Sequence, residues 1–92
     1  MVNSQSKFAL GQVVATSNAL ARISPDDVSI GIRRHAAGDW GEVDEEDCAS
    51  NEKALTEGLR LMSIYTDPCG TTFWIVTEWD RSFTTVLLPE DY

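Results

Sequence analysis

Hydrophobic and polar positions alternate along the last third of the chain, with the period of two that is typical of β-strands. The alternating segments are rich in β-branched and aromatic side chains. Asp67-Pro68-Cys69-Gly70 and Asp80-Arg81-Ser82 separate them, and both are turn sequences. We therefore predict a three-stranded antiparallel meander, joined by a strand over residues 8–15. The meander segments are residues 59–66, 71–79 and 83–88.

Helix signals occupy the middle of the chain. Ser24 and Gly38 delimit one helix, and Asp44 and Gly58 delimit a second one, because each pair places a capping side chain at the start and a glycine at the end. A short helical turn over residues 18–22 precedes them, with Thr16 or Ser17 as its cap. The helix that starts at Asp44 has a predicted buried face, on which the asparagine is expected to be a hydrogen-bonded structural residue: Cys48, Asn51, Leu55 and Leu59.

These elements predict an α+β fold. We expect a three- to four-stranded antiparallel sheet, formed by the N-terminal strand and the C-terminal meander, with two to three helices packed on one face. The length of 92 residues suits one domain. Residues 1–7 are expected to be a flexible polar N-terminus, and residues 8–92 the single domain.

The formal net charge of -8 narrows the choice of partners. This charge repels nucleic acid and anionic lipid, so we expect neither direct nucleic-acid binding nor membrane association. The expected partner is a basic protein or a nucleoprotein complex, bound by a monomer or a homodimer. Because the chain shows no signal peptide and no apolar run of about 18 residues, a cytoplasmic location with Cys48 and Cys69 as free thiols is predicted.

Residues that carry catalysis or bind metals are sparse. His35 is the only histidine, and its spacing from Cys48 and Cys69 matches no zinc-site pattern and no nucleophile signature. The glycines of the 38–41 segment do not match a phosphate-binding loop. We therefore expect no catalytic residue, no metal site and no cofactor, and we predict a non-enzymatic protein.

Most of the net charge lies in residues 39–57, where Lys53 is the only basic residue. The helix dipole explains acids in a first helical turn, where each contributes about 0.3–1 kcal/mol, so a solvated helix face is one interpretation. It does not explain the acids outside that turn. The other interpretation is a surface that resembles nucleic-acid phosphates and attracts a basic groove. The candidate partner-binding carboxylates are Asp39, Glu42, Glu45, Glu46 and Glu52.

Trp40 lies between two glycines within the same acidic segment. A small core needs its large aromatic side chains, which favours a tryptophan that folds back into the core as an anchor. The alternative is an exposed aromatic hot spot for the partner, so Trp40 joins the candidate partner-binding residues.

Three strings carry a resemblance that covers residues 8–92. They are His35-x-x-Gly38-Asp39-Trp40-Gly41, Asn51-Glu52-x-Ala54-Leu55-x-x-Gly58, and the segment from Thr77-Glu78-x-Asp80-Arg81-Ser82 to Leu87-Leu88-Pro89-Glu90-Asp91-Tyr92. The chain resembles a family of short bacterial proteins labelled plasmid-related or type I restriction endonuclease subunit. The resemblance implies no catalytic residue for this chain.

The association of that family with mobile elements suggests an inhibitor of host defence, of the anti-CRISPR or anti-restriction type. We therefore expect a protein-binding inhibitor whose acidic surface mimics nucleic acid on a defence complex. The alternative is a small intracellular accessory or scaffolding domain that self-associates, for example through an exposed edge strand.

Overall fold

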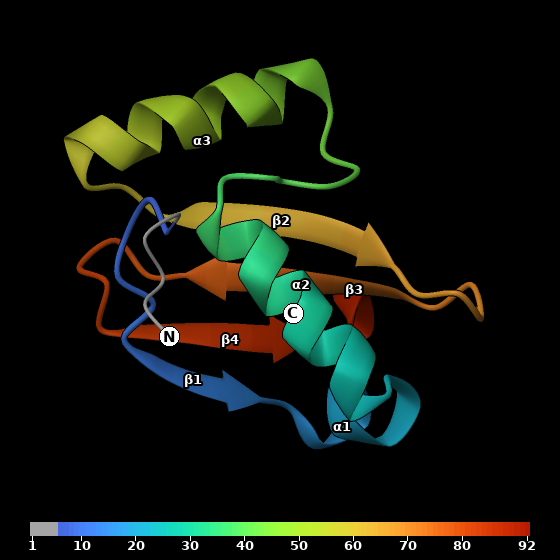
Figure 1. The fold of residues 1–92 in the computed structure, drawn as a ribbon. Helices are drawn as coiled ribbons and strands as arrows, with labels where there is room; N and C mark the ends of the chain where they lie inside the picture. The colour runs from blue at the N-terminus through green and yellow to red at the C-terminus, as the bar shows by residue number, and fades with distance from the viewer. Residues whose placement is uncertain (1–5) are drawn as a thin grey trace.

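The computed structural model describes residues 6–92 and shows helices packed on one face of a four-stranded sheet, which confirms the α+β prediction (Figure 1). The elements are β1 (Gln12–Ala15), α1 (Ser17–Arg22), α2 (Pro25–Ala36), α3 (Glu45–Glu57), β2 (Leu61–Thr66), β3 (Thr72–Thr77), β4 (Phe83–Leu87) and the 3-10 helix η1 (Pro89–Asp91). The strand order is β1-β4-β3-β2. In Figure 1, α2 lies across the sheet and α3 lies along its β2 side. No helix within residues 6–92 has the length and apolar character needed to cross a membrane.

The predicted meander is present, since β2, β3 and β4 pair antiparallel in chain order. The expectation of an entirely antiparallel sheet is wrong in one pairing, because β1 runs parallel to β4. Side chains alternate in the same way in either direction, so the pattern of a strand does not reveal which way its neighbour runs.

The N-terminal strand is shorter than the predicted residues 8–15. Gly11 has φ +66°, and a Cβ atom there would lie 2.3 Å from the Ser82 carbonyl oxygen, so the chain bends at a point where only glycine fits. Phe8 lies before this bend and packs on the Trp40 ring, with centroids 6.2 Å apart. Residues 1–5 of the predicted flexible N-terminus lie outside the described residues. Lys7 lies inside them and donates its N–H to the Ala36 carbonyl oxygen at 2.8 Å.

The capping residues predicted for the helices are confirmed. The Ser24 side chain accepts the N–H of Asp27 at 3.2 Å at the start of α2. Asp44 caps α3 in the same way, through the N–H of Asp47 at 2.8 Å. Gly58 ends α3 in the left-handed conformation, with φ 68°. These starts and stops depend on neighbours in sequence, which explains why they were predictable.

The core consists of two clusters under the helices. The larger one fills the space between the sheet and the first two helices, and its buried members are Ala19, Ile23, Tyr65, Phe73, Ile75, Val86 and Leu88. The smaller one lies under α3 and contains Trp40, Ala54 and Leu61. α3 therefore rests on its own small apolar cluster beside the main core.

A buried chain of hydrogen bonds crosses the sheet. Thr84 Oγ1 donates to the Leu10 carbonyl oxygen at 2.7 Å, so it must accept from Thr77 Oγ1, 2.7 Å away. The Thr77 hydroxyl has then used its proton, so His35 Nε2 donates to it at 2.9 Å. His35 Nδ1 accepts from Ser63 Oγ at 2.5 Å. A neutral imidazole with its proton on Nε2 therefore satisfies every member of the chain.

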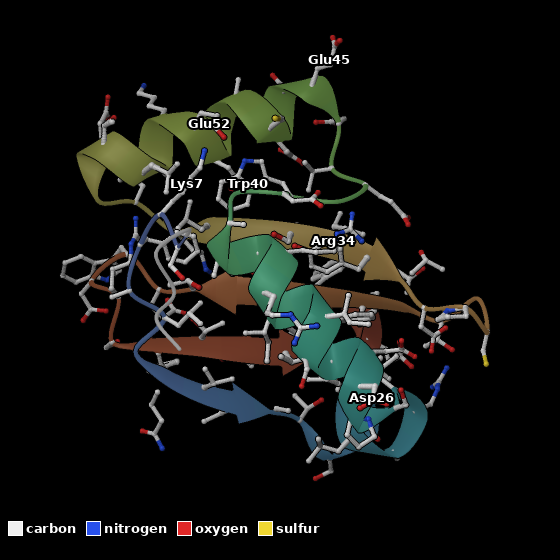
Figure 2. All side chains as sticks on the ribbon, in the orientation of Figure 1. Lys7, Asp26, Arg34, Trp40, Glu45 and Glu52 are labelled. Carbon is white, nitrogen blue, oxygen red and sulfur yellow. The ribbon has the colours of Figure 1, made fainter. Side chains whose placement is uncertain are left out.

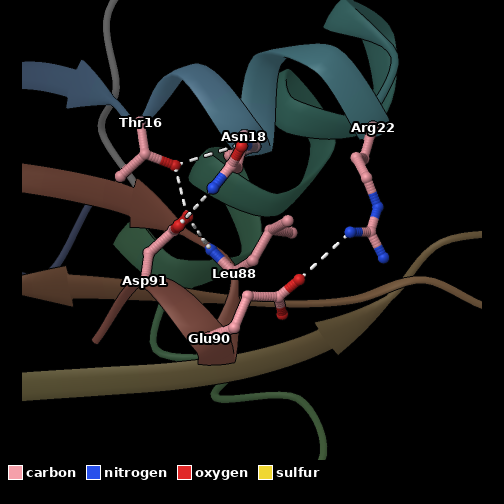
Figure 3. A network of polar contacts seen from close by, with 7 residues as sticks. Thr16, Asn18, Arg22, Leu88, Glu90 and Asp91 are labelled. Carbon is pink, nitrogen blue, oxygen red and sulfur yellow. Dashed lines mark hydrogen bonds and ion pairs between the residues drawn. The ribbon is translucent and has the colours of Figure 1, made fainter.

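The C-terminal turn is fastened to α1 (Figure 3). Asp91 accepts hydrogen bonds from Thr16 Oγ1 and Asn18 Nδ2, both at 2.7 Å, and these bonds lower the pKa of its carboxyl group, the Thr16 bond most. Arg22 also pairs with Glu90 at 3.0 Å. Because Thr16 directly follows β1, this fastening helps to hold the end of β1 beside β4.

Candidate protein-binding surface on α3

α3 contacts the rest of the protein through a narrow stripe. Asn51 and Ala54 are its buried residues, and Leu55 is half-buried. The predicted buried face is wrong at Cys48, which is exposed, and at Leu59, which is 46% exposed. A helix that lies beside the edge of a sheet buries one stripe only, and the rest of its surface faces solvent.

Asn51 takes the place of a neighbouring strand for β2. Its side chain accepts the N–H of Met62 at 3.1 Å and donates to the Met62 carbonyl oxygen at 2.8 Å. Ile64 is the next residue of β2 whose backbone groups point away from β3, and it pairs with the 40–42 loop. Its N–H donates to the Trp40 carbonyl oxygen at 3.1 Å, and Glu42 N–H donates to the Ile64 carbonyl oxygen at 2.7 Å. The structural role predicted for Asn51 is confirmed, and this edge of the sheet is closed.

Trp40 is 4% exposed, so the anchor interpretation is confirmed and the exposed hot spot is wrong. Its indole Nε1 donates to Glu52 Oε2 at 2.8 Å, and its ring packs edge-on against His35 with centroids 5.7 Å apart. Trp40 lies beneath α3 in Figure 2, with Glu52 on the helix above it. Glu52 is exposed, but its carboxylate is engaged in holding Trp40.

Asp39 is neutralised by Arg34. The guanidinium donates through Nε at 2.7 Å and through a second nitrogen at 3.2 Å, and Gly41 N–H adds a bond at 3.2 Å. The Arg34 hydrogen bond lowers the pKa of the Asp39 carboxyl group and raises that of the guanidinium. Asp39 therefore belongs to a local ion pair and adds little to a negative surface.

The Glu42 carboxylate makes a hydrogen bond to a neutral side chain. Its Oε1 accepts a hydrogen bond from Thr66 Oγ1 at 3.0 Å, in the loop that closes β2. The Thr66 hydroxyl is neutral, so this contact brings no opposite charge to the carboxylate.

Glu45 and Glu46 lie in the first turn of α3, together with Asp47. All three are exposed, and Figure 2 shows Glu45 pointing away from the sheet. Within residues 6–92, no hydrogen bond or ion pair engages these carboxylates. We call Glu42, Glu45, Glu46 and Asp47 the α3 acidic surface.

His35 is fully buried, and both of its ring nitrogens are used in the core. Burial, followed by the nearby charge of Arg81, lowers its pKa to about 4. Cys48 and Cys69 are exposed free thiols. Among the described residues, no three His, Cys, Asp or Glu side chains gather in an arrangement that could hold a metal ion.

Trp79 is 65% exposed, although it was not among the predicted binding residues. β3 ends at Thr77, so Trp79 lies in the turn and not in the strand predicted to reach it. Arg81 holds this turn with φ 60° and donates to the carbonyl oxygens of Glu78 and Trp79 at 2.9 and 3.3 Å. The alternation Glu78-Trp79-Asp80 fits a half-buried strand, so no local signal identified Trp79 as exposed.

Comparison of the chain with protein-family models, with curated proteins and with solved structures found no match. The resemblance to short bacterial proteins therefore stays a prediction.

Proposed function

We propose that this protein is a non-enzymatic inhibitor that docks its α3 acidic surface on a basic surface of another protein, in place of nucleic acid. The observation that carries the proposal is the first turn of α3, where Glu45, Glu46 and Asp47 face solvent and have no hydrogen-bond or ion-pair partner within residues 6–92. Unpaired charges on a rigid helix need no rearrangement to meet cations on a partner.

The charge of the whole chain supports the same function. With a net charge of -8, long-range attraction steers the protein towards a basic surface and speeds association at low ionic strength. Arg34, on the neighbouring helix, is paired with Asp39, and of the four residues of the α3 acidic surface only Glu42 contributes to its raised pKa. A groove that normally holds nucleic acid offers the clustered cations that this surface requires.

The resemblance noted in the sequence suggests which basic surface to test. We propose a bacterial defence complex as the target, with the protein acting as an anti-CRISPR or anti-restriction inhibitor. We propose Glu42, Glu45, Glu46 and Asp47 as the binding residues, because Asp39, Trp40 and Glu52 have roles within the fold.

The proposal is tested by capture on the immobilised protein from bacterial lysate, with washes at low and high salt and identification by mass spectrometry. The affinity of the purified captured complex is then measured for the wild type and for Glu45→Lys/Glu46→Lys. We expect a basic nucleic-acid-binding complex that is released by salt and not bound by the double variant.

Asp26→Lys is the matched control for Glu46→Lys. Asp26 and Glu46 are both exposed and occupy the second position of their helices, after Pro25 and Glu45. Figure 2 shows Asp26 at the start of α2, away from α3. The control should bind like the wild type. Binding by the double variant that survives high salt would exclude the acidic mechanism.

A further inference from the structure

The outer side of β1 is open in the part of the chain that the structure describes. The N–H groups of Gln12 and Thr16 donate to carbonyl oxygens on the β4 side, at 3.1 and 3.0 Å. Backbone groups of alternate residues face opposite sides of a strand, so Val13 and Ala15 direct their N–H and C=O groups away from β4. No hydrogen bond within residues 6–92 engages these outward groups.

β1 lacks two of the features that usually protect an edge strand, charge and proline, although it is short. Its sequence is Gln12-Val-Val-Ala15, with no charged residue and no proline. Val13 is 43% exposed and Val14 is 39% exposed. An uncharged strand with exposed valines and unpaired backbone groups is suited to pair with another strand.

We propose that β1 pairs antiparallel with β1 of a second copy of this chain, so that the two sheets become one continuous sheet. In the pairing that uses every outward group, Val13 of each copy lies opposite Ala15 of the other, and each pair exchanges hydrogen bonds in both directions. Val14 then lies on the twofold axis, next to Val14 of the second copy.

Two features of the structure favour a second copy over another protein. An interface with twofold symmetry must be self-complementary. This holds for β1, because the N–H and C=O groups of Val13 in one copy can meet the C=O and N–H groups of Ala15 in an antiparallel second copy, and the reverse. The charge distribution agrees, because the α3 acidic surface lies along β2, at the opposite edge from β1 in the strand order. Pairing through β1 joins the neutral edges and keeps the acidic surfaces at the far ends.

The expected association is weak. β1 extends from Gln12 to Ala15 only, so the interface falls below the roughly 1,200 Å² that specific stable complexes bury. We therefore expect a monomer–dimer equilibrium that depends on protein concentration. Raised salt should leave the dimer unchanged or strengthen it, because salt screens repulsion between two chains that each carry a charge of -8.

A cysteine cross-link tests the register. In a background of Cys48→Ser/Cys69→Ser, Val14→Cys places two thiols at a non-hydrogen-bonded pair, where Cβ atoms are about 4.5–5.5 Å apart or closer and a disulfide can form under a mild oxidant. Val13→Cys is the matched control, because each Val13 faces Ala15 and not its own copy. We expect rapid dimer formation for Val14→Cys only. Equal cross-linking of the two variants would overturn the register.

Sedimentation equilibrium tests the association itself. We expect the wild type and Val14→Thr to dimerise, and Val14→Lys to remain monomeric because it sets two ammonium groups against each other. Circular dichroism verifies that Val14→Lys is folded, and the cross-link gives an independent result if it is not. A wild type that stays monomeric at all concentrations would overturn the proposal, as would dimerisation of a folded Val14→Lys.

The dimer and the proposed function can fail separately. Glu45→Lys/Glu46→Lys is expected to dimerise like the wild type, whereas Val14→Lys is expected to bind the captured basic complex through α3. Loss of dimerisation in the α3 variant would contradict the location of the interface at β1.

Discussion

Along β2, the outer edge of the sheet is covered by Asn51 and by the 40–42 loop, whereas along β1, at the opposite edge, the backbone of Val13 and Ala15 faces outward. The β2 edge is also bordered by the acidic residues of α3, and β1 carries no charge. An edge can thus be closed by a single amide side chain and a loop. The difference predicts salt-sensitive binding of a basic partner on the β2 side and self-pairing at β1.

The largest expected effect is the loss of the amide that closes β2. Asn51→Leu removes both hydrogen bonds to Met62 and leaves the Met62 N–H and carbonyl oxygen without these partners. We therefore expect the free energy of unfolding to fall by about 3 to 4 kcal/mol. Urea denaturation followed by circular dichroism measures this. Asn51→Asp keeps the acceptor for the Met62 N–H but sets a buried carboxylate oxygen against the Met62 carbonyl oxygen, so it should not restore the stability. Equal stability of the leucine variant would show that the edge does not need closing.

The buried chain of hydrogen bonds from Ser63 to Leu10 joins the β2 edge of the sheet to the β1 edge. It contains His35, so the pH dependence of the free energy of unfolding tests whether the two edges unfold together. The folded pKa of His35 is about 4, below the ordinary 6.5, so the unfolded state binds more protons between these values. Stability is therefore full above pH 6.5 and falls with pH until it levels off near pH 4. Between pH 7.5 and 5 we expect a loss of about 2 kcal/mol, from about 1.4 kcal/mol per pH unit.

Urea titrations at these two pH values, read by tryptophan fluorescence and by circular dichroism, provide the measurement. His35→Gln, which does not titrate, should be less stable but nearly independent of pH in this range. A wild-type slope that persists in His35→Gln would assign the pH dependence to other groups. Different midpoints from the two probes would show that the edges unfold separately.

The carboxylates of α3 differ in role, and a pair of alanine substitutions separates them. Glu52→Ala leaves the buried Nε1–H of Trp40 without an acceptor, so we expect a loss of about 1 to 2 kcal/mol of stability. Glu46→Ala removes a carboxylate that has no partner among the described residues, and it should change stability by less. Urea denaturation at neutral pH measures the loss of stability in both variants, with Glu52→Gln as a conservative control. Equal losses would contradict a structural role that is specific to Glu52.

The smallest expected effect concerns the helix starts. Glu46→Lys and Asp26→Lys each place a cation at the positive end of a helix dipole, and each should lower stability by about 0.5 kcal/mol. Thermal denaturation at low and high salt measures the two losses, which salt should reduce. The variants should differ in partner binding, which only the α3 variant loses. A much larger loss for either would point to a contact beyond the dipole.

Much of the fold could be predicted because its signals are local. Ser24, Asp44 and Gly58 delimit helices through contacts with residues a few positions away, and the alternation of the last third places β2, β3 and β4. The candidate site was predictable only as a run of acids. The sequence could not show that Arg34 neutralises Asp39, or that Glu52 holds Trp40, because each contact depends on how the chain folds around α3.

The sequence by itself determined the order and approximate positions of the helices and strands, the meander and the strongly negative charge, since capping, alternation and composition do not depend on distant contacts. The tertiary structure alone decided that β1 runs parallel to β4, that Trp79 is exposed, and that the two edges differ. The physical reason is that these features arise from pairings between residues far apart in the chain. A side chain such as Asn51 closes an edge only when α3 lies along β2, and β1 stays open because no described segment packs there.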